Sequence, residues 1–144
     1  MHIHDIMTRD VEVIRPDATV QEAAKKMDEL NVGPLPVCDG DRLVGVLTDR
    51  DIVVRGAAAG MNPTTTPVRD VMTRDVVTCT EHADVDDAAR IMEVNQIRRL
   101  MILNDDQKLV GIVSLGDLAV QTGDEELAGE TLQQISEPAE PDRG

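Results

Sequence analysis

The sequence predicts a mixed α/β (α+β) fold, built from two tandem copies of one β-α-β-β-α unit and followed by a short C-terminal helix. Three observations lead to this prediction. The chain has 144 residues, and a chain of about 150 residues buries about 70% of its unfolded surface in a compact domain. An internal repeat divides it into two similar halves. Each half alternates helical and extended apolar patterns.

Three blocks of similar sequence recur in the same order in the two halves, which indicates a duplicated unit. The second copy follows the first by 65 residues or, after a one-residue slip, by 66: DIMTRDV (5–11) and DVMTRDV (70–76), ATVQEAAKKM (18–27) and ADVDDAARIM (83–92), LVGVLTDRDI (43–52) and LVGIVSLGDL (109–118). The blocks predict repeat 1 at 1–60, a linker at 61–69, repeat 2 at 70–123, and an acidic C-terminal helix with a disordered tail at 124–144.

The first repeat is predicted to contain an extended segment at 11–14, a helix at 20–30, strands at 35–39 and 42–48, and a helix at about 49–59. Thr19 and Glu22 have the spacing of a capping box, which fixes the start of the first helix. The sequence DGD at 39–41 is a strong hairpin signal between the two strands. Gly60 can end the second helix.

The second repeat is predicted to have a helix at 85–96, strands at 100–104 and 108–113, and a helix at 115–122. Beyond it, residues 125–136 are predicted to form a short amphipathic helix, docked on the body or on a second subunit. Its apolar face would carry Leu127, Ala128, Thr131, Leu132 and Ile135. Gly129 weakens this helix, and a frayed end is expected from Glu137.

The composition excludes several kinds of partner. The chain contains no Phe, Tyr or Trp, so it can build neither an aromatic cage for a methylated amine nor a stacking platform for single-stranded nucleic acid. The net charge of −14 also argues against nucleic acid, because its phosphates are bound by Lys and Arg. Seven acidic residues and one Arg lie in 124–144, so the tail is the most acidic part.

The sequence also favours a cytoplasmic protein. No apolar run approaches 18 residues, so no membrane span is predicted. The N-terminus, MHIHDIMTRD, lacks the apolar region of a signal peptide. Cys38 and Cys79 are expected to be buried, reduced thiols. A zinc site formed by the two cysteines and His2, His4 and His82 is a less favoured alternative, because their spacing does not indicate one.

The most informative segments are GVLTDRD at 45–51 and GIVSLGD at 111–117. Each brings a hydroxyl residue to the start of a helix and a carboxylate one turn later. The pairs are Thr48 with Asp51 and Ser114 with Asp117.

Two interpretations fit this spacing. The first is a capping box with Asp in place of Glu, a device also expected at Asp84 and Asp87. Spacing alone favours this one. The second is a ligand site, because a carboxylate can accept two hydrogen bonds from a ribose diol, each worth roughly 1.5–3 kcal/mol. Amides at the same helix start would favour a phosphate.

The twin repeats, each opening with D-[IV]-M-T-R-D-V and closing with G-h-h-[TS]-x-x-D, resemble a pair of CBS domains, also called a Bateman module. The resemblance covers about residues 3–123 and is strongest to small stand-alone bacterial proteins of the hypoxic response protein type. It implies two repeats related by pseudo-twofold symmetry, two clefts between them, and a disc-like homodimer. It also implies energy sensing or a stress response.

The resemblance further implies which residues contact an adenosine ligand. The motif Asp would hold the ribose, the hydroxyl residue would contact ribose or phosphate, and the apolar residue two before it would contact the base. The opening segment of the other repeat would complete each cleft. One set is Asp117, Ser114, Ile112, Met7, Thr8 and Glu12; the other is Asp51, Thr48, Val46, Met72, Thr73 and Val77.

Basic residues before the first hairpin strand meet phosphates in this family. That position holds Arg98 and Arg99 in repeat 2 but Gly33 and Pro34 in repeat 1. We therefore expect the Asp117 cleft to bind phosphorylated adenosine more tightly. Arg50 and Arg55 are weaker phosphate candidates, and a solvated Arg pair that offsets the acidic residues is the alternative for Arg98 and Arg99.

The leading hypothesis is a regulatory module that binds AMP, ADP or ATP, or S-adenosylmethionine, with no obligatory cofactor, and signals to a separate, unknown protein. A structural or partner-binding CBS dimer without nucleotide is the alternative. A regulatory fragment of an enzyme or transporter is less favoured. No cluster of nucleophile, base and orienting group is present, so catalysis is not expected.

Overall fold

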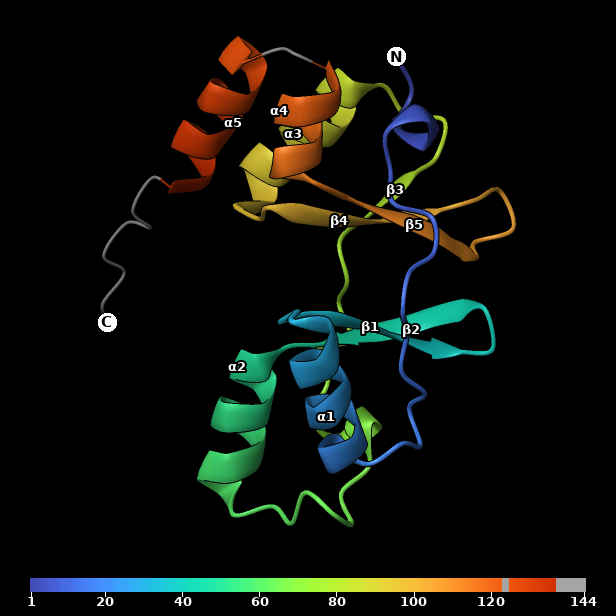
Figure 1. The fold of residues 1–144 in the computed structure, drawn as a ribbon, viewed down its shortest axis with the longest axis vertical. Coiled ribbons are helices and arrows are strands. Elements are labelled where there is room, and N and C mark those ends of the chain that lie inside the picture. The colour runs from blue at the N-terminus through green and yellow to red at the C-terminus, as the bar shows by residue number, and fades with distance from the viewer. Residues whose placement is uncertain (123–124, 137–144) are drawn as a thin grey trace. The chain divides into compact units, whose positions relative to one another are not determined.

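The computed structural model describes residues 1–122 and 125–136, and in it the chain forms two compact units (Figure 1). We call them the Asp51 unit and the Asp117 unit after the motif carboxylate that each contains. The Asp51 unit consists of Val11–Val76 and Asp106–Leu109. The Asp117 unit consists of Met1–Asp10, Val77–Asp105 and the described residues from Val110 on. Each unit therefore takes the opening segment of one repeat and the body of the other.

The Asp51 unit is built on a helix and a hairpin. Helix α1 (Val20–Leu30) begins at the predicted capping box, where the Glu22 amide donates to Thr19 Oγ1 at 3.2 Å. Strands β1 (Leu35–Asp39) and β2 (Arg42–Leu47) pair antiparallel, with Asp39 opposite Arg42. Gly40 in the turn has a φ of 66°, which a residue without a Cβ adopts at little cost. These elements confirm the predicted ranges to within one residue.

The predicted helix at 49–59 is correct in extent but not in type. A single turn of α-helix, α2 (Asp49–Asp51), continues as a π-helical stretch at Ile52–Gly56 and a 3₁₀ turn at Ala57–Ala59. Gly60 ends it with a φ of 76°. Gly56 is buried, and a Cβ placed on it would lie 2.6 Å from Met61 Cε. Gly56 thus packs closely against Met61, and a helical pattern in the sequence does not reveal such a contact.

The Asp117 unit has a three-stranded sheet covered by helices (Figure 1). Strand β3 (Thr78–Thr80) runs parallel to β4 (Arg99–Leu103), and β5 (Leu109–Ser114) lies on the other side of β4. Helices α3 (Val85–Asn95), α4 (Leu115–Thr122) and α5 (Glu125–Ser136) complete the unit. The mixed α+β fold predicted from the two repeats is thus confirmed.

Helix α5 packs on α3 and α4 within the same unit, which agrees with docking on the body. Leu127 and Ile135 lie against the core, and Thr131 is fully buried. The Thr131 hydroxyl lies 2.8 Å from the Leu127 carbonyl oxygen and 3.2 Å from Glu93 Oε1. The predicted contribution of Ala128, and the frayed end from Glu137, fall outside the described side chains and residues.

One predicted helix cap is wrong. Asp84 precedes α3 but makes no side-chain capping bond. Its carboxylate lies instead 3.7 Å from His2 Nε2, and the Val85 amide donates to the Met1 carbonyl at 3.2 Å. The N-terminal segment therefore accepts a hydrogen bond at the start of α3, which the Asp84 side chain was expected to cap.

Both units have aliphatic cores, as the absence of aromatic residues requires. Cys79 belongs to the core of the Asp117 unit, and both cysteines are free and buried as predicted. Burial raises the pKa of the Cys38 thiol to about 11, helped by the nearby Asp41 carboxylate. Burial also raises the pKa of Cys79. Both thiols are therefore protonated at neutral pH and poorly reactive.

Candidate functional site

In each unit, an opening segment pairs with the strand that leads into the motif. In the Asp117 unit, the Thr8 amide donates to the Ile112 carbonyl at 2.8 Å, and the Ile112 amide donates back at 3.0 Å. In the Asp51 unit, Thr73 and Val46 exchange the equivalent bonds at 2.8 and 2.9 Å. The structure therefore brings four of the predicted site residues together as two matched pairs.

The first glycine of each motif makes this pairing possible. A Cβ on Gly111 would lie 2.6 Å from Met7 Sδ and 2.9 Å from the Thr8 carbonyl oxygen. A Cβ on Gly45 would meet Met72 Sδ at 2.7 Å and the Thr73 carbonyl oxygen at 2.8 Å. Both methionines are buried. The predicted site residues Met7 and Met72 thus pack closely against the motif glycines. The sequence did not reveal this role of the glycines.

The Asp51 carboxylate is enclosed by groups of its own unit. Its Oδ2 accepts from the Thr48 amide at 3.0 Å, and the Asp51 amide donates to Thr48 Oγ1 at 3.0 Å. Thr73 Oγ1 lies 3.1 and 3.2 Å from the two carboxylate oxygens, and Arg55 Nε lies 4.0 Å from Oδ1. Asp51 is 8% exposed. The predicted capping box is present, and other groups occupy the rest of the carboxylate.

The Asp117 carboxylate is more open. Its Oδ2 accepts from the Ser114 amide at 2.8 Å, and the Asp117 amide donates to Ser114 Oγ at 3.0 Å. Thr8 stands where Thr73 stands in the other unit, but it is exposed, and within the described residues it makes no bond to Asp117. Asp117 is half-buried. One carboxylate oxygen therefore retains capacity to accept hydrogen bonds.

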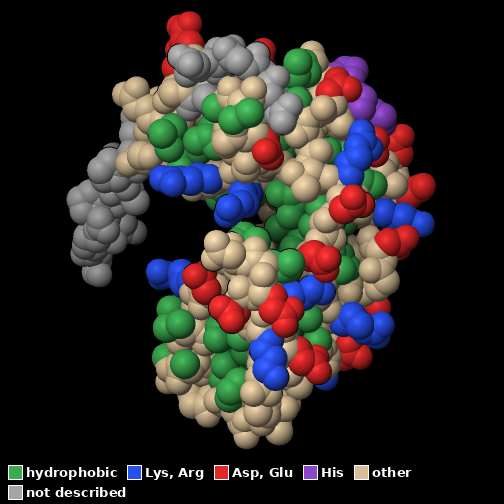
Figure 2. Space-filling model, viewed as in Figure 1, with side chains coloured by type: hydrophobic (Ala, Val, Ile, Leu, Met, Phe, Trp, Pro, Cys, Tyr) green, Lys and Arg blue, Asp and Glu red, His purple; other side chains and the backbone are tan. Residues whose placement is uncertain are grey.

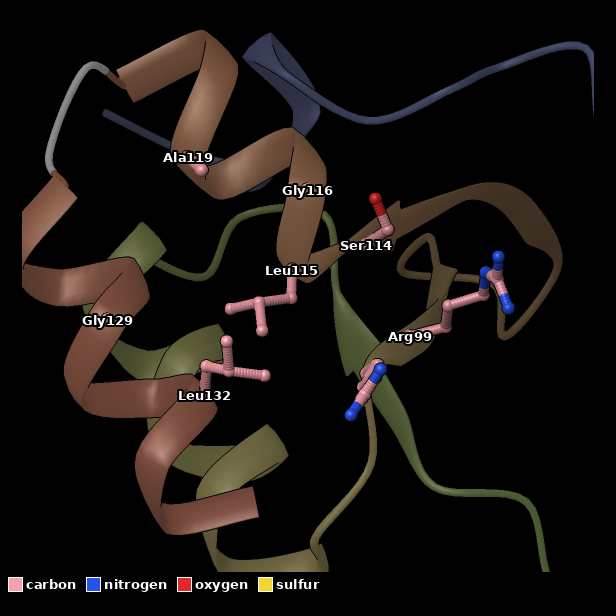
Figure 3. Close-up of a pocket in the computed structure, with 8 residues that line it drawn as sticks. Arg99, Ser114, Leu115, Gly116, Ala119, Gly129 and Leu132 are labelled. Atoms are coloured by element: carbon pink, nitrogen blue, oxygen red, sulfur yellow. The ribbon is translucent and has the colours of Figure 1, made fainter. Parts of the chain in front are cut away.

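A cavity of about 590 Å³ adjoins the Asp117 motif (Figure 3). Ser114 and the two predicted arginines, Arg98 and Arg99, contribute to its lining. The other lining residues come from the start of α4 and from α5: Leu115, Gly116, Ala119, Gly129 and Leu132. This volume lies in the range of small-molecule sites. The participation of α5 was not predicted from the sequence.

The two arginines are available to an anion. Both are exposed, and in residues 1–122 and 125–136 neither forms an ion pair with an acidic side chain. The Arg98 carbonyl accepts from the Leu115 amide at 2.9 Å, which ties the pair to the start of α4. Their exposure also fits the alternative, a solvated arginine pair that offsets the acidic residues, so the role of these arginines stays a prediction.

Four further candidates do not line this cavity. Glu12 belongs to the Asp51 unit, where its carboxylate lies 3.3 Å from Lys26 Nζ, and Val77 belongs to the Asp117 unit, where it packs against the core. Their assignment to the opposite motifs stays a prediction. Arg55 donates to the Met72 carbonyl at 3.1 Å, and Arg50 is exposed in α2.

The three histidines gather on one surface of the Asp117 unit (Figure 2). The His4 ring lies 5.5 Å from that of His2 and 6.4 Å from that of His82, measured between centroids. Each has a carboxylate within 3.1–3.7 Å. Over the part of the chain that the structure describes, no three His, Cys, Asp or Glu side chains are arranged to hold a metal ion.

Comparison with known proteins identifies the family. The CBS domain model matches residues 3–57 and 68–121. The chain is a CBS-domain pair. It is 45% identical over 134 residues to the CBS domain-containing protein YhcV of Bacillus subtilis, covering 93% of this chain and 94% of YhcV. It is 38% identical over 116 residues to hypoxic response protein 1 of Mycobacterium tuberculosis, covering 80% of each. The predicted resemblance is thereby confirmed.

Solved structures of other CBS proteins have the same fold. Hypoxic Response Protein I with two coordinated zinc ions has a TM-score of 0.76 and 37% identity, covering 84% of this chain and 98% of that one. CBSX2 in complex with AMP has a TM-score of 0.73 and 27% identity, covering 87% and 98%. The CBS pair of MJ0100, in complex with 5′-methylthioadenosine and S-adenosylmethionine, has a TM-score of 0.72 and 28% identity, covering 85% and 100%.

The structure also bears on the membrane question. Among the described residues, no helix of this CBS-domain pair is both long and apolar enough to cross a membrane.

Proposed function

We propose that this CBS-domain pair is a regulatory module that binds an adenosine nucleotide (AMP, ADP or ATP, with S-adenosylmethionine as a further candidate) and that it is not an enzyme. The observation that carries the proposal is the cavity beside the Asp117 motif, which Ser114, Arg98 and Arg99 line together. A carboxylate suits a ribose diol, and a pair of guanidinium groups suits phosphate. The Asp117 carboxylate beside the cavity and the arginine pair that lines it thus match the two polar parts of a nucleotide.

The Asp117 motif is the better candidate for the tighter site. A diol at Asp51 would compete with Thr73 and Arg55 for a carboxylate that is already enclosed. A diol at Asp117 would instead find an oxygen that accepts no bond from any described residue. No arginine pair corresponding to Arg98 and Arg99 precedes β1, where Gly33 and Pro34 stand. Geometry and charge therefore favour the same unit.

The solved relatives support the ligand class, because one is complexed with AMP and another with 5′-methylthioadenosine and S-adenosylmethionine. We further propose that the chain acts in the cytoplasm as a homodimer in energy sensing or a stress response, and that the regulated protein is a separate chain. Bound ligand would signal through a change in dimer geometry. Such a signal requires different affinities for two arrangements of the dimer.

Calorimetric titration with AMP and ATP tests the proposed site. Asp117→Asn removes the charge but keeps an acceptor oxygen for the Ser114 amide. We expect affinity to fall by about 10- to 100-fold, the equivalent of about 1.5–3 kcal/mol of charge-assisted hydrogen bonding. Asp51→Asn should cost less. Asp86→Asn, which makes the same change at an exposed position in the first turn of α3, is the matched control and should cost nothing.

Equal losses for the Asp117 and Asp51 variants would contradict the preference for the Asp117 unit. Thermal melting of the wild type separates the proposal from the second candidate function, a structural or partner-binding dimer. Ligand at 100 times its Kd should stabilise the protein by roughly 2.7 kcal/mol. The absence of any shift with millimolar AMP, ATP or S-adenosylmethionine would favour the partner-binding dimer, in which the motif carboxylates act only as helix caps.

A further inference from the structure

The cavity beside the Asp117 motif has two chemically different sides. Ser114, Arg98 and Arg99 supply polar and cationic groups. Leu115 and Leu132 supply the apolar side, and their side chains point toward one another, whereas the Arg99 guanidinium extends away from them (Figure 3). Leu132 and Gly129 belong to α5, which lies outside the residues that the CBS domain model matches. A helix beyond the family's common fold thus forms part of this cavity.

Gly129 has no evident purpose in the fold. It lies inside the 12-residue helix α5, where glycine is less favourable than alanine. Its φ is not positive, and a Cβ built on it meets no atom within 4 Å. Neither backbone geometry nor close packing therefore requires a glycine. Gly129 lines the cavity, and the position of its missing side chain is open space.

The wall that α5 forms is held in place by its opposite face. Thr131 is fully buried, and its hydroxyl lies 3.2 Å from Glu93 Oε1 of α3. The Gln96 side-chain amide, just beyond α3, donates to the Gln134 carbonyl at 3.4 Å. The face that carries Gly129 and Leu132 is therefore fixed relative to Ser114 and the arginines, which belong to the same unit.

We propose that α5 is the far wall of the nucleotide site in the Asp117 unit, and that Gly129 leaves the room needed by the groups attached to the 5′ carbon of the ribose. This inference rests on the proposed function. Ser114 Oγ accepts a hydrogen bond from the Asp117 amide. Ser114 also lines the cavity, whereas Asp117 does not. A nucleotide whose ribose is held by Asp117 and whose 5′ side faces Ser114 therefore extends its phosphates into the cavity, which Arg98, Arg99 and α5 line together. The length of the phosphate chain then decides how closely it approaches α5.

The test is the ratio of ATP affinity to AMP affinity, measured by calorimetry on the full chain. Gly129→Leu fills the end of the cavity, and we expect it to weaken ATP binding at least tenfold while AMP binding changes less than threefold. Leu132→Glu places a negative charge near the terminal phosphates and should lower the same ratio. Gln133→Leu and Gln133→Glu are matched controls, because Gln133 is exposed on α5 and does not line the cavity.

The outcomes separate the two proposals. Wild-type binding with an ATP-to-AMP ratio that stays constant in Gly129→Leu and Leu132→Glu would overturn the role of α5 and leave the proposed function standing. Binding of neither nucleotide to the wild type would overturn both. Leu132 is already 42% exposed, so Leu132→Glu keeps the test decisive even where Gly129→Leu disturbs the helix.

Discussion

Two residues of each motif, the first glycine and the last carboxylate, have structural roles that need no ligand. The glycine that opens the motif admits a methionine and a backbone carbonyl to within 3 Å of where a side chain would stand. The carboxylate that closes it accepts a hydrogen bond from the amide at the start of its own helix, which it thereby caps. The cap was predicted from spacing, because its two partners are three residues apart. The role of the glycine was not, because Met7 and Gly111 are about 100 residues apart in the sequence.

We expect Gly111→Ala to destabilise the protein by about 1–3 kcal/mol, the usual cost of overpacking a close contact. The new methyl group meets the Thr8 backbone as well as the Met7 side chain, so a change of rotamer cannot remove the clash. Chemical denaturation monitored by circular dichroism measures the change. Gly129→Ala is the control, and it should be neutral or stabilising because its methyl group meets nothing. Equal stability of the two variants would contradict this account.

At the scale of elements, the sequence predicted those parts whose signals are local. Helix α1 and the β1–β2 hairpin lie where capping and turn residues place them. The π-helical stretch after α2 was missed, because it accompanies the packing of Gly56 against Met61 across the end of that helix. For the site, Ser114, Arg98 and Arg99 were predicted and line one cavity, whereas the contribution of α5 depends on tertiary packing.

The attachment of α5 to α3 can be tested through Thr131. Thr131→Val keeps the shape of the side chain but removes the hydroxyl that lies beside the Leu127 carbonyl and Glu93. We expect a loss of about 1 kcal/mol, the net value of one hydrogen bond. Thr131→Ser, which retains the hydroxyl, serves as the comparison for that bond. Unchanged unfolding would show that the hydroxyl contributes nothing.

At the scale of the whole molecule, the net charge affects stability and the lack of aromatic residues restricts how a ligand can be bound. The chain carries 28 acidic and 14 basic residues, and its core is entirely without aromatic rings. A protein with a large net charge loses stability through self-repulsion, which salt screens.

The bound adenine would have to lie between aliphatic side chains, since no ring is present to stack on it. Binding must also be measured without intrinsic Trp or Tyr fluorescence.

We expect the melting temperature at pH 7 to rise as NaCl is increased from about 20 mM to about 300 mM, which shortens the screening length severalfold. A gain on the order of 1 kcal/mol corresponds to about 2–4 °C for a chain of this size. The same titration close to the isoelectric point of about 4.4 is the control, because little net charge remains to be screened there. A melting temperature that does not depend on salt at pH 7 would show that self-repulsion is negligible.

The exchange of opening segments between the repeats has a consequence for synthesis on the ribosome. Met1–Asp10 leaves the ribosome well before the rest of its unit, because the Ala83 and Ile112 carbonyls that Ile3 and Thr8 bind are made about 80 and about 100 residues later. At about 5–20 residues per second, this delay lasts several seconds or more. During that time the apolar side chains of Ile3, Ile6 and Met7, which are buried in the finished protein, lack their partners. Residues 1–10 are thus made early but fold late, so their apolar side chains stay exposed while the rest of the unit is made.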